Sequence, residues 1–190
     1  MRLQKLTMVN TAYGVNYEDI PAALVTPEIR RSLMNVKSAM VNNVLSCHAD
    51  TTLDSIALMM WDNDCGSLPV VDDDNKPVGI ITDRDIAIGS ALQHRPLWEI
   101  TAESVCGNRD LYCCKSTDDI HKALDMMRDH AVRRLPVVNS KGKLVGIVSL
   151  GDLVACTDAA KGAGFPFGEM AGMLSAVSSH HTQPKLTATA

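Results

Sequence analysis

Two stretches of the chain carry apolar residues at helical spacing. In both stretches the apolar positions fall at i, i+3, i+4 and i+7, which predicts a helix with one buried face. We expect the first helix to begin at Thr51, where Asp54 would complete a capping box, and the second to begin near Asp118. The two apolar sets are Leu53, Ile56, Ala57 and Met60, and Ile120, Ala123, Leu124 and Met127.

Each predicted helix is followed by two short apolar runs and then by a second helix. Polar residues typical of turns join the runs at 72–76 and at 139–143, so both pairs predict β-hairpins. The second helices are expected to start at 83–85 and at 151–152, and a short apolar stretch precedes each first helix. The predicted order is therefore β-α-β-β-α, twice. The apolar stretches are Val44-Leu45 and Leu111-Tyr112, and the hairpin runs are 68–71, 78–82, 135–138 and 144–148.

The two halves of the chain are related by an internal repeat. Shifting the chain by 67 residues places 44–87 on 111–154 without a gap, and 13 of the 44 aligned positions are identical. This spacing exceeds the 20–50 residues typical of solenoid repeats, and only two copies are present. We therefore expect two homologous lobes that pack around an approximate two-fold axis.

Composition narrows the class of protein. The 190 residues are 46% hydrophobic and 21% charged with a formal net charge of −4, which favours a folded chain. Aromatic residues reach only 4% and basic residues are scattered, so we expect no nucleic-acid binding. No apolar run approaches the roughly 18–20 residues of a membrane span and no signal peptide is evident, so we expect no membrane contact and a cytoplasmic location.

The six cysteines show no C-x-x-C spacing and no histidine partner at zinc-finger distance, so zinc binding is not expected. We interpret them as reduced thiols in the core. An oxidation response of the adjacent pair Cys113-Cys114 is the alternative. The six are Cys47, Cys65, Cys106, Cys113, Cys114 and Cys156.

Two similar heptads suggest a family. The sequence Gly-Ile-Ile-Thr-Asp-Arg-Asp at 79–85 and its counterpart Gly-Ile-Val-Ser-Leu-Gly-Asp at 146–152 each follow a Leu-Pro-Val-Val run. Together these motifs resemble a tandem pair of cystathionine β-synthase (CBS) domains, or Bateman module, over about 36–157. The resemblance implies an α/β (α+β) fold in which two β-α-β-β-α repeats pack as a pseudo-two-fold pair. We assign 36–95 to the first repeat, 96–157 to the second, and 1–35 and 158–190 to terminal extensions, the last with a disordered tail.

The heptads also carry candidate binding chemistry. Thr82 and Asp85, like Ser149 and Asp152, place a hydroxyl and a carboxylate three residues apart at the start of a helix. A carboxylate can accept hydrogen bonds from both hydroxyls of a ribose, while the hydroxyl and the free N–H groups of the helix suit phosphate oxygens. The alternative is that these residues only cap their helices. No base accompanies either hydroxyl, so the pattern indicates binding and not catalysis.

The resemblance further implies two ligand sites in the cleft between the repeats. In the first, Thr82, Arg84 and Asp85 would face the second repeat, and in the second, Ser149 and Asp152 would face the first. Only the first site would have arginines near a phosphate, which favours this site and favours AMP as its ligand. ATP, ADP and S-adenosylmethionine remain possible ligands. Segments 44–46 and 111–113 would contact the adenine. The facing residues are Val132, Arg133 and Arg134 for the first site and Cys65, Gly66 and Ser67 for the second.

The leading hypothesis is a regulatory module, not an enzyme, that requires no cofactor, forms a homodimer and signals to a separate, unknown protein. Two other functions are weighed against it. One is a structural pair with vestigial pockets; the other is a nucleotide hydrolase, for which the acidic run 72–74 is the only metal-binding candidate and is interpreted as a turn. Outside the repeats we expect a helix from Pro27 towards Met40 that packs on a lobe or on a partner, and a solvated tail around His180-His181.

Overall fold

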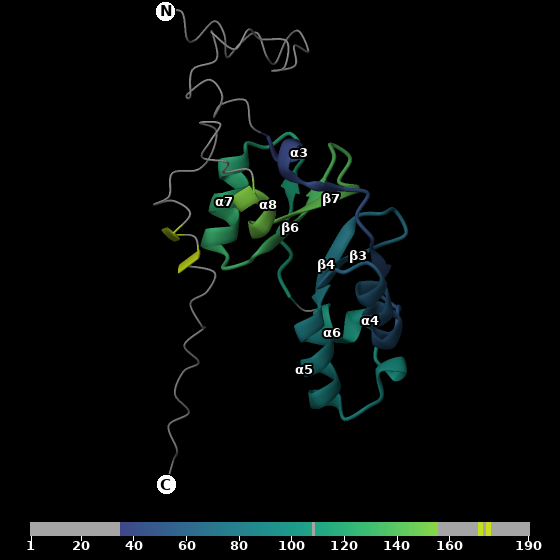
Figure 1. Cartoon of the computed structure of the whole chain (residues 1–190). Coiled ribbons are helices and arrows are strands. Elements are labelled where there is room, and N and C mark those ends of the chain that lie inside the picture. Colours follow the sequence, from purple (N-terminus) through teal and green to yellow (C-terminus); the bar gives the residue numbers. More distant parts are fainter. Residues whose placement is uncertain (1–34, 108, 156–170, 173, 176–190) are drawn as a thin grey trace, which may run out of the picture.

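The computed structural model describes residues 35–107, 109–155, 171–172 and 174–175. Within them the chain forms two lobes that lie side by side, each built from one small sheet and the helices that pack on it (Figure 1). Most of the predicted helix from Pro27 falls outside the described residues, and so do Cys156, the predicted disordered tail and His180-His181. Its predicted continuation to Met40 is wrong, because Asn35 is extended and caps a separate short helix that begins at Val36. No helix in the described part of the chain is both long and apolar enough to cross a membrane.

The first lobe has a three-stranded sheet in the order β2-β3-β4. Strands β2 (Cys47–His48) and β3 (Ser67–Val71) run parallel because helix α4 (Leu53–Asp62) connects them. Strand β4 (Pro77–Thr82) returns antiparallel to β3 through the predicted hairpin and leads directly into helix α5 (Asp83–Gln93). A short 3₁₀ helix, η3 (Leu97–Glu99), and helix α6 (Ala102–Cys106) then pack on the same lobe.

The second lobe repeats this order. Strand β5 (Cys114–Lys115), helix α7 (Ile120–Asp129), strands β6 (Arg134–Val138) and β7 (Leu144–Ser149) and helix α8 (Leu150–Ala155) follow one another. The sheet gains a fourth strand, β1 (Val41–Asn42), which pairs antiparallel with β7 after helix α3 (Val36–Ala39). The mixed α/β fold with two β-α-β-β-α units is therefore confirmed.

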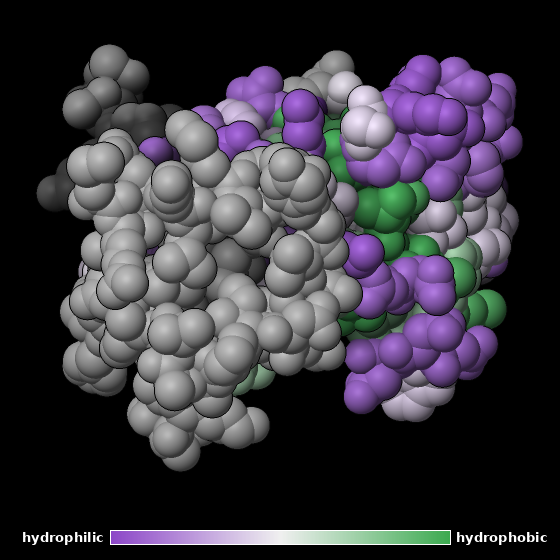
Figure 2. Space-filling view, turned by 90° about the horizontal axis from the view of Figure 1, so that it is seen from above, coloured by the Kyte–Doolittle hydropathy of each residue, from purple (hydrophilic) through white to green (hydrophobic). Residues whose placement is uncertain are grey.

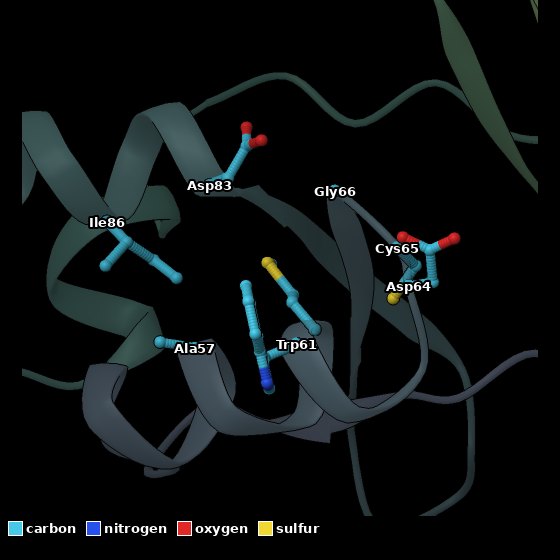
Figure 3. Close-up of a pocket in the computed structure, with 8 residues that line it drawn as sticks. Ala57, Trp61, Asp64, Cys65, Gly66, Asp83 and Ile86 are labelled. Atoms are coloured by element: carbon cyan, nitrogen blue, oxygen red, sulfur yellow. The ribbon is translucent and has the colours of Figure 1, made fainter.

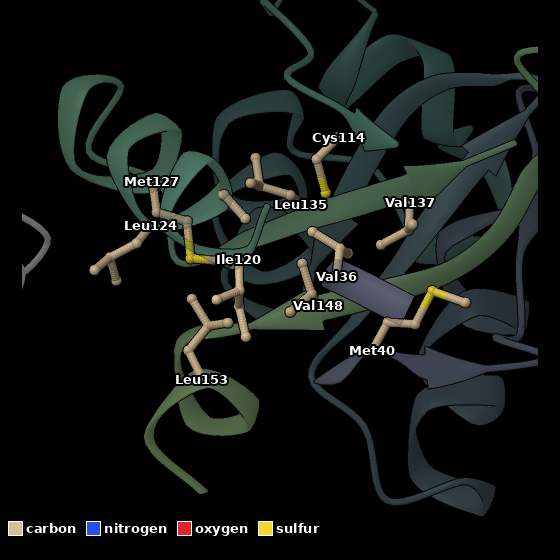
Figure 4. Close-up of a cluster of buried hydrophobic side chains, with 11 residues drawn as sticks. Val36, Met40, Cys114, Ile120, Leu124, Met127, Leu135, Val137, Val148 and Leu153 are labelled. Carbon is tan, nitrogen blue, oxygen red and sulfur yellow. The ribbon is translucent and has the colours of Figure 1, made fainter. Parts of the chain in front are cut away.

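The two hydrophobic cores exchange the segments that precede the repeats. Val36 and Met40, which precede the strands and helices of the first lobe in sequence, are buried in the core of the second lobe (Figure 4). Ile100, Ala102 and Cys106, which precede the strands of the second repeat, are buried in the core of the first lobe. The lobes thus divide the chain differently from the sequence boundary at 95 and 96, because the lead-in helix of each repeat, α3 or α6, packs on the lobe of the other repeat.

A glycine in each sheet makes room for this exchange. A Cβ on Gly79 would lie 3.1 Å from the Cys106 sulfur, and a Cβ on Gly146 would lie 2.5 Å from the carbonyl oxygen of Val41 and 3.0 Å from the Met40 sulfur. The 67-residue shift places Gly79 on Gly146. A glycine at this position permits another part of the chain to approach the strand closely, and here that part is the segment that begins the other repeat.

Three local predictions need correction. The strands expected at Val44-Leu45 and Leu111-Tyr112 lie three residues later, because parallel pairing with β3 and β6 begins only at Cys47 and Cys114. Helix α4 is capped by Thr52, one residue after the expected Thr51, and its hydroxyl contacts Ser55 and makes no capping bond.

The five cysteines among the described residues are free thiols, and three of them, Cys47, Cys106 and Cys114, are buried. Burial raises the pKa of the Cys47 and Cys114 thiols to about 12 and that of Cys113 to about 11. Thiols with such pKa values are almost entirely protonated at neutral pH, and the thiolate is the reactive form. The interpretation as core thiols is confirmed for the three buried cysteines, whereas Cys65 and Cys113 are half-buried.

Candidate functional site

The first heptad forms a complete capping box at the start of α5. The amide and hydroxyl of Thr82 donate to Asp85 Oδ2 at 2.9 and 2.7 Å, and the amide of Asp85 donates to the Thr82 hydroxyl at 3.2 Å. Thr82 and Asp85 therefore do cap helix α5. The capping bonds occupy only one of the two carboxylate oxygens of Asp85, Oδ2.

The second heptad has the same geometry at the start of α8. The amide and hydroxyl of Ser149 donate to Asp152 Oδ2 at 2.7 and 2.6 Å, and the amide of Asp152 donates to the Ser149 hydroxyl at 3.2 Å. The duplicated chain thus builds the same turn twice. In both copies the outer oxygen, Oδ1, is left for another partner.

The two outer oxygens differ in what contacts them. Asp85 Oδ1 forms an ion pair with Arg109, which lies in the connecting segment between α6 and β5, just before the range 111–154 that aligns with the first repeat. The Asp85 side chain is 12% exposed, whereas that of Arg109 is 57% exposed. For Asp152 Oδ1, no hydrogen-bond partner is found within the described parts of the chain.

The ion pair changes the protonation equilibrium of Asp85. Burial would by itself raise the pKa of this carboxyl, but hydrogen bonds from Arg109 and Thr82 outweigh it and hold the pKa below its ordinary value. The carboxylate is therefore charged at neutral pH and is a strong acceptor. Sequence reasoning missed Arg109, because it lies outside the aligned repeat and 24 residues from Asp85.

The segments before each Leu-Pro-Val-Val run lie beside the hydroxyl residue of their own repeat. Ser67 pairs with Thr82 across the first hairpin, and Arg134 pairs with Ser149 across the second. Backbone bonds reinforce this, since the amide of Asp83 donates to Gly66 and that of Leu150 donates to Arg133. The hairpin pairing thus fixes these neighbours within a repeat, in addition to any crossed contacts expected from the resemblance.

Arg134 nevertheless extends to the other repeat. A Cβ on Gly66 would lie 3.6 Å from Arg134 Nη2 and 3.2 Å from Asp83 Oδ2. A guanidinium of the second repeat therefore lies against the loop and the helix start of the first. Of the other predicted residues, Arg84 and Arg133 are exposed, and Val132 packs against the second core.

A cavity of about 430 Å³ opens in the first lobe between α4 and α5 (Figure 3). Ala57 and Trp61 of α4 face Asp83 and Ile86 of α5 across it, and Gly66 closes one side. Cys65 and Gly66, predicted for the second site, thus share a cavity with Asp83 of the first heptad. Asp85 does not line this cavity.

A second cavity of about 330 Å³ lies where the lobes meet. Val44 and Ser46, expected near adenine, line it together with Leu144 of the second lobe. Asn75 closes the junction, because its carbonyl accepts from the Leu144 amide at 2.8 Å and its side-chain amide donates to the Leu144 carbonyl at 3.3 Å. The other expected adenine segment contains Tyr112, whose ring stacks on His130 at 3.6 Å.

The visible surface is mixed in polarity. In the view from above, hydrophobic residues form a band enclosed by hydrophilic ones over the part that is not grey (Figure 2). Among the described residues, no group of three or more histidine, cysteine, aspartate or glutamate side chains is arranged to hold a metal ion. The acidic run 72–74 forms the turn between β3 and β4, where Asp72 Oδ1 accepts from the amides of Asp74 and Lys76.

Proteins of other organisms are similar in sequence to the duplicated region of this chain. An uncharacterized protein of Methanopyrus kandleri is 30% identical over 112 residues, which are 59% of this chain and 57% of that protein. The CBS domain-containing protein YhcV of Bacillus subtilis is 34% identical over 126 residues, covering 64% of this chain and 84% of YhcV. The matched region thus spans little more than half of the Methanopyrus protein and most of YhcV.

Solved structures show the same fold. Hypoxic Response Protein I, determined with two coordinated zinc ions, matches with a TM-score of 0.59 and 30% identity over 64% of this chain and 98% of that one. The CBS domain pair of MJ0100, in complex with 5′-methylthioadenosine and S-adenosyl-L-methionine, matches with a TM-score of 0.57 at 24% identity over 64% and 98%. CBSX2 in complex with AMP matches with a TM-score of 0.57 at 23% identity over 67% and 98%.

The family assignment rests on the whole duplicated region. The CBS domain family matches residues 36–89 and again residues 102–157. These two ranges contain both lead-in helices, both hairpins and both capping boxes described above. The chain belongs to the CBS domain family, as a tandem pair of the kind that serves as a regulatory module.

Proposed function

We propose that this CBS pair binds an adenosine nucleotide, with AMP as the preferred ligand, and signals its presence to a separate protein. The observation that carries the proposal is the position of Arg134 beside Gly66 and Asp83, near the first heptad. A cation from one repeat thereby lies close to the carboxylate turn of the other. This combination suits a molecule that carries a sugar at one end and a phosphate at the other.

The chemistry of the ligand follows from the groups around Asp85. Its carboxylate is charged and can accept from the two hydroxyls of a ribose. Arg134 can bind phosphate through charge-assisted hydrogen bonds, each worth about 1.5–3 kcal/mol. Because S-adenosylmethionine carries a cationic sulfonium in place of the phosphate, we expect it to bind this site more weakly than AMP, ADP or ATP.

Solved CBS pairs support the ligand class. CBSX2 was determined with AMP, and the pair of MJ0100 with two adenosyl compounds. At 23% and 24% identity these structures share the fold with this chain, so the ligand preference is argued from this chain's own residues. The signal would arise if the ligand binds one arrangement of the two lobes more tightly than another.

A purely structural role is the second candidate. It is favoured by the capping boxes, which give both carboxylates a local function, and by the ion pair that already occupies Asp85. The two proposals differ in a measurable way. A structural pair shows no stabilisation by any adenosyl compound.

We further propose that the module forms a homodimer. Four large apolar side chains on α4 and α5 are exposed, whereas the outward positions of α7 are mainly charged. Exposed apolar residues that cluster on a surface commonly mark an interface. Light scattering of Trp61→Ser and Leu92→Ser variants should show monomers if this face is used. The four residues are Leu58, Trp61, Ile88 and Leu92.

Titration calorimetry with AMP and adenosine tests the ligand proposal. Arg134→Ala should weaken AMP binding about tenfold or more and leave adenosine binding unchanged, because only the phosphate contact is lost. Asp85→Asn should weaken both ligands while it keeps an oxygen for the capping box. Arg95→Ala, whose partner Glu99 is exposed, is the matched arginine control and should bind as the wild type does. Wild-type protein that binds neither compound would support the structural role.

A further inference from the structure

We propose that Arg109 sets the ligand specificity of the Asp85 site: it competes with ribose for the carboxylate and, once displaced, contacts the phosphate of the ligand. The site would then select phosphorylated over neutral adenosyl compounds. This inference rests on the proposed function. It concerns one residue of the connecting segment that neither the repeat nor the capping boxes explain.

The competition follows from how the oxygens of Asp85 are used. Oδ2 accepts two hydrogen bonds from Thr82, so it is committed to the helix start. Oδ1 is the oxygen that remains for a sugar hydroxyl, and Arg109 occupies it. Because the Asp85 side chain is 12% exposed, little of the carboxylate is open to a second partner while the ion pair persists.

The backbone of Arg109 is held in place by a hydrogen bond, whereas its exposed side chain is able to change rotamer. Its amide donates to the carbonyl of Cys106, the last residue of α6, and α6 packs in the first core against Gly79 of β4. The guanidinium is 57% exposed and has no other ion-pair partner within the described residues. A rotamer change can therefore release the carboxylate without disturbing the core.

The cost of displacement depends on the ligand. A neutral nucleoside must separate the guanidinium from a largely buried carboxylate and offers the released cation no new partner. A nucleotide carries a phosphate on the same sugar, and this phosphate can form bidentate hydrogen bonds with a guanidinium. The ion pair between Arg109 and Asp85 thus weakens the binding of adenosine more than the binding of AMP.

The second repeat provides an internal comparison. Asp152 forms the same capping box, but its Oδ1 has no such cation within the described ranges. Selection by Arg109 should therefore be confined to the first site.

The test measures Kd for AMP and for adenosine in Arg109→Ala, by titration calorimetry in an Asp152→Asn background that isolates the first site. We expect adenosine to bind about fivefold tighter and AMP about threefold weaker, so that the ratio of the two constants falls more than tenfold. Arg109→Gln, which keeps a polar side chain but removes the guanidinium and its charge, should change the ratio in the same direction. Arg95→Ala, which removes an exposed arginine with a 3.4 Å partner, should leave the ratio unchanged.

Two results would overturn the inference, and they are distinguishable. In the first result, the protein with Arg109 intact binds AMP, and neither Arg109→Ala nor Arg109→Gln changes the ratio of its Kd values for adenosine and AMP. Arg109 then has no part in specificity, and the proposed function stands. If neither AMP nor adenosine binds the wild type or any variant, the proposed function fails and the inference fails with it. Melting temperatures and circular dichroism of both variants verify that they fold.

Discussion

The two CBS repeats build the same turn and give it different surroundings. Asp85 and Asp152 bond to Thr82 and Ser149 in the same geometry, yet among the residues that the structure describes only Asp85 has an arginine on its outer oxygen. The scaffold is set by local hydrogen bonds within each repeat, whereas the cation beside Asp85 comes from a segment outside the aligned ranges 44–87 and 111–154. Duplication therefore preserved the helix start and left the electrostatics of each site free to diverge.

The glycines of the two sheets differ in a similar way. A Cβ on Gly79 would meet the end of a cysteine side chain, but a Cβ on Gly146 would meet the backbone of β1. A side chain such as that of Cys106 can rotate, whereas the backbone of β1 cannot move without breaking its pairing with β7. The second lobe should therefore tolerate a larger residue at this glycine less well than the first lobe.

Substituting these glycines should give the largest contrast. Gly146→Ala forces β1 away from β7 and should lower the free energy of unfolding by about 3 kcal/mol, near the upper end of the usual cost of overpacking. Gly79→Ala should cost about 1 kcal/mol, because the Cys106 sulfur can shift by a few tenths of an ångström. Urea denaturation measures both. Equal losses in the two variants would contradict the packing difference.

Removing each carboxylate should have a smaller and still unequal effect on stability. Asp85→Ala loses the capping box and the ion pair and should cost about 2 kcal/mol, whereas Asp152→Ala loses only the cap and should cost about 1 kcal/mol. Thermal melts monitored by circular dichroism provide the comparison. A smaller loss at Asp85 than at Asp152 would mean that the Arg109 ion pair does not stabilise the fold.

The ion pair also predicts how stability depends on pH. The pKa of Asp85 is lower in the folded state than in the unfolded chain, so its contribution is present above the unfolded-state pKa of about 4 and is lost as pH falls through the folded-state pKa. The difference in unfolding free energy between wild type and Asp85→Asn should be about 1 kcal/mol at neutral pH and should shrink below pH of about 4. Urea denaturation at several pH values measures it. A difference that stays constant down to pH of about 2 would show that the charge of Asp85 does not matter.

The hairpin turns offer the smallest contrast. Asn75 and Gly142 are equivalent by the repeat and both adopt positive φ, at 61° and 76°, but only Asn75 donates a side-chain hydrogen bond to the other lobe. Asn75→Gly should cost about 0.5–1 kcal/mol, the usual contribution of one hydrogen bond. Gly142→Asn should change stability by less than about 0.5 kcal/mol, since nothing lies within 4 Å of a Cβ there and asparagine tolerates this backbone conformation. A loss of similar size in Gly142→Asn would contradict the expectation that asparagine tolerates the conformation of this turn.

Much of the fold was predictable from local patterns. The buried faces of α4 and α7, both hairpins and the starts of α5 and α8 follow from periodicity and turn residues. The strands β2 and β5 were placed three residues early, because two-residue strands are too short to show alternation and are defined only by their pairing. At the site, the heptad residues were identified, but Arg109 and the bridging Asn75 were not.

The sequence by itself determined the duplicated unit, since each helix and hairpin depends on residues close together in the chain. It also determined the two capping boxes, which need only a hydroxyl and a carboxylate three residues apart. The tertiary structure decided which lobe each lead-in helix joins and which cation faces Asp85. These features depend on contacts between residues distant in sequence, such as the approach of Val41 to Gly146, and no local pattern specifies them.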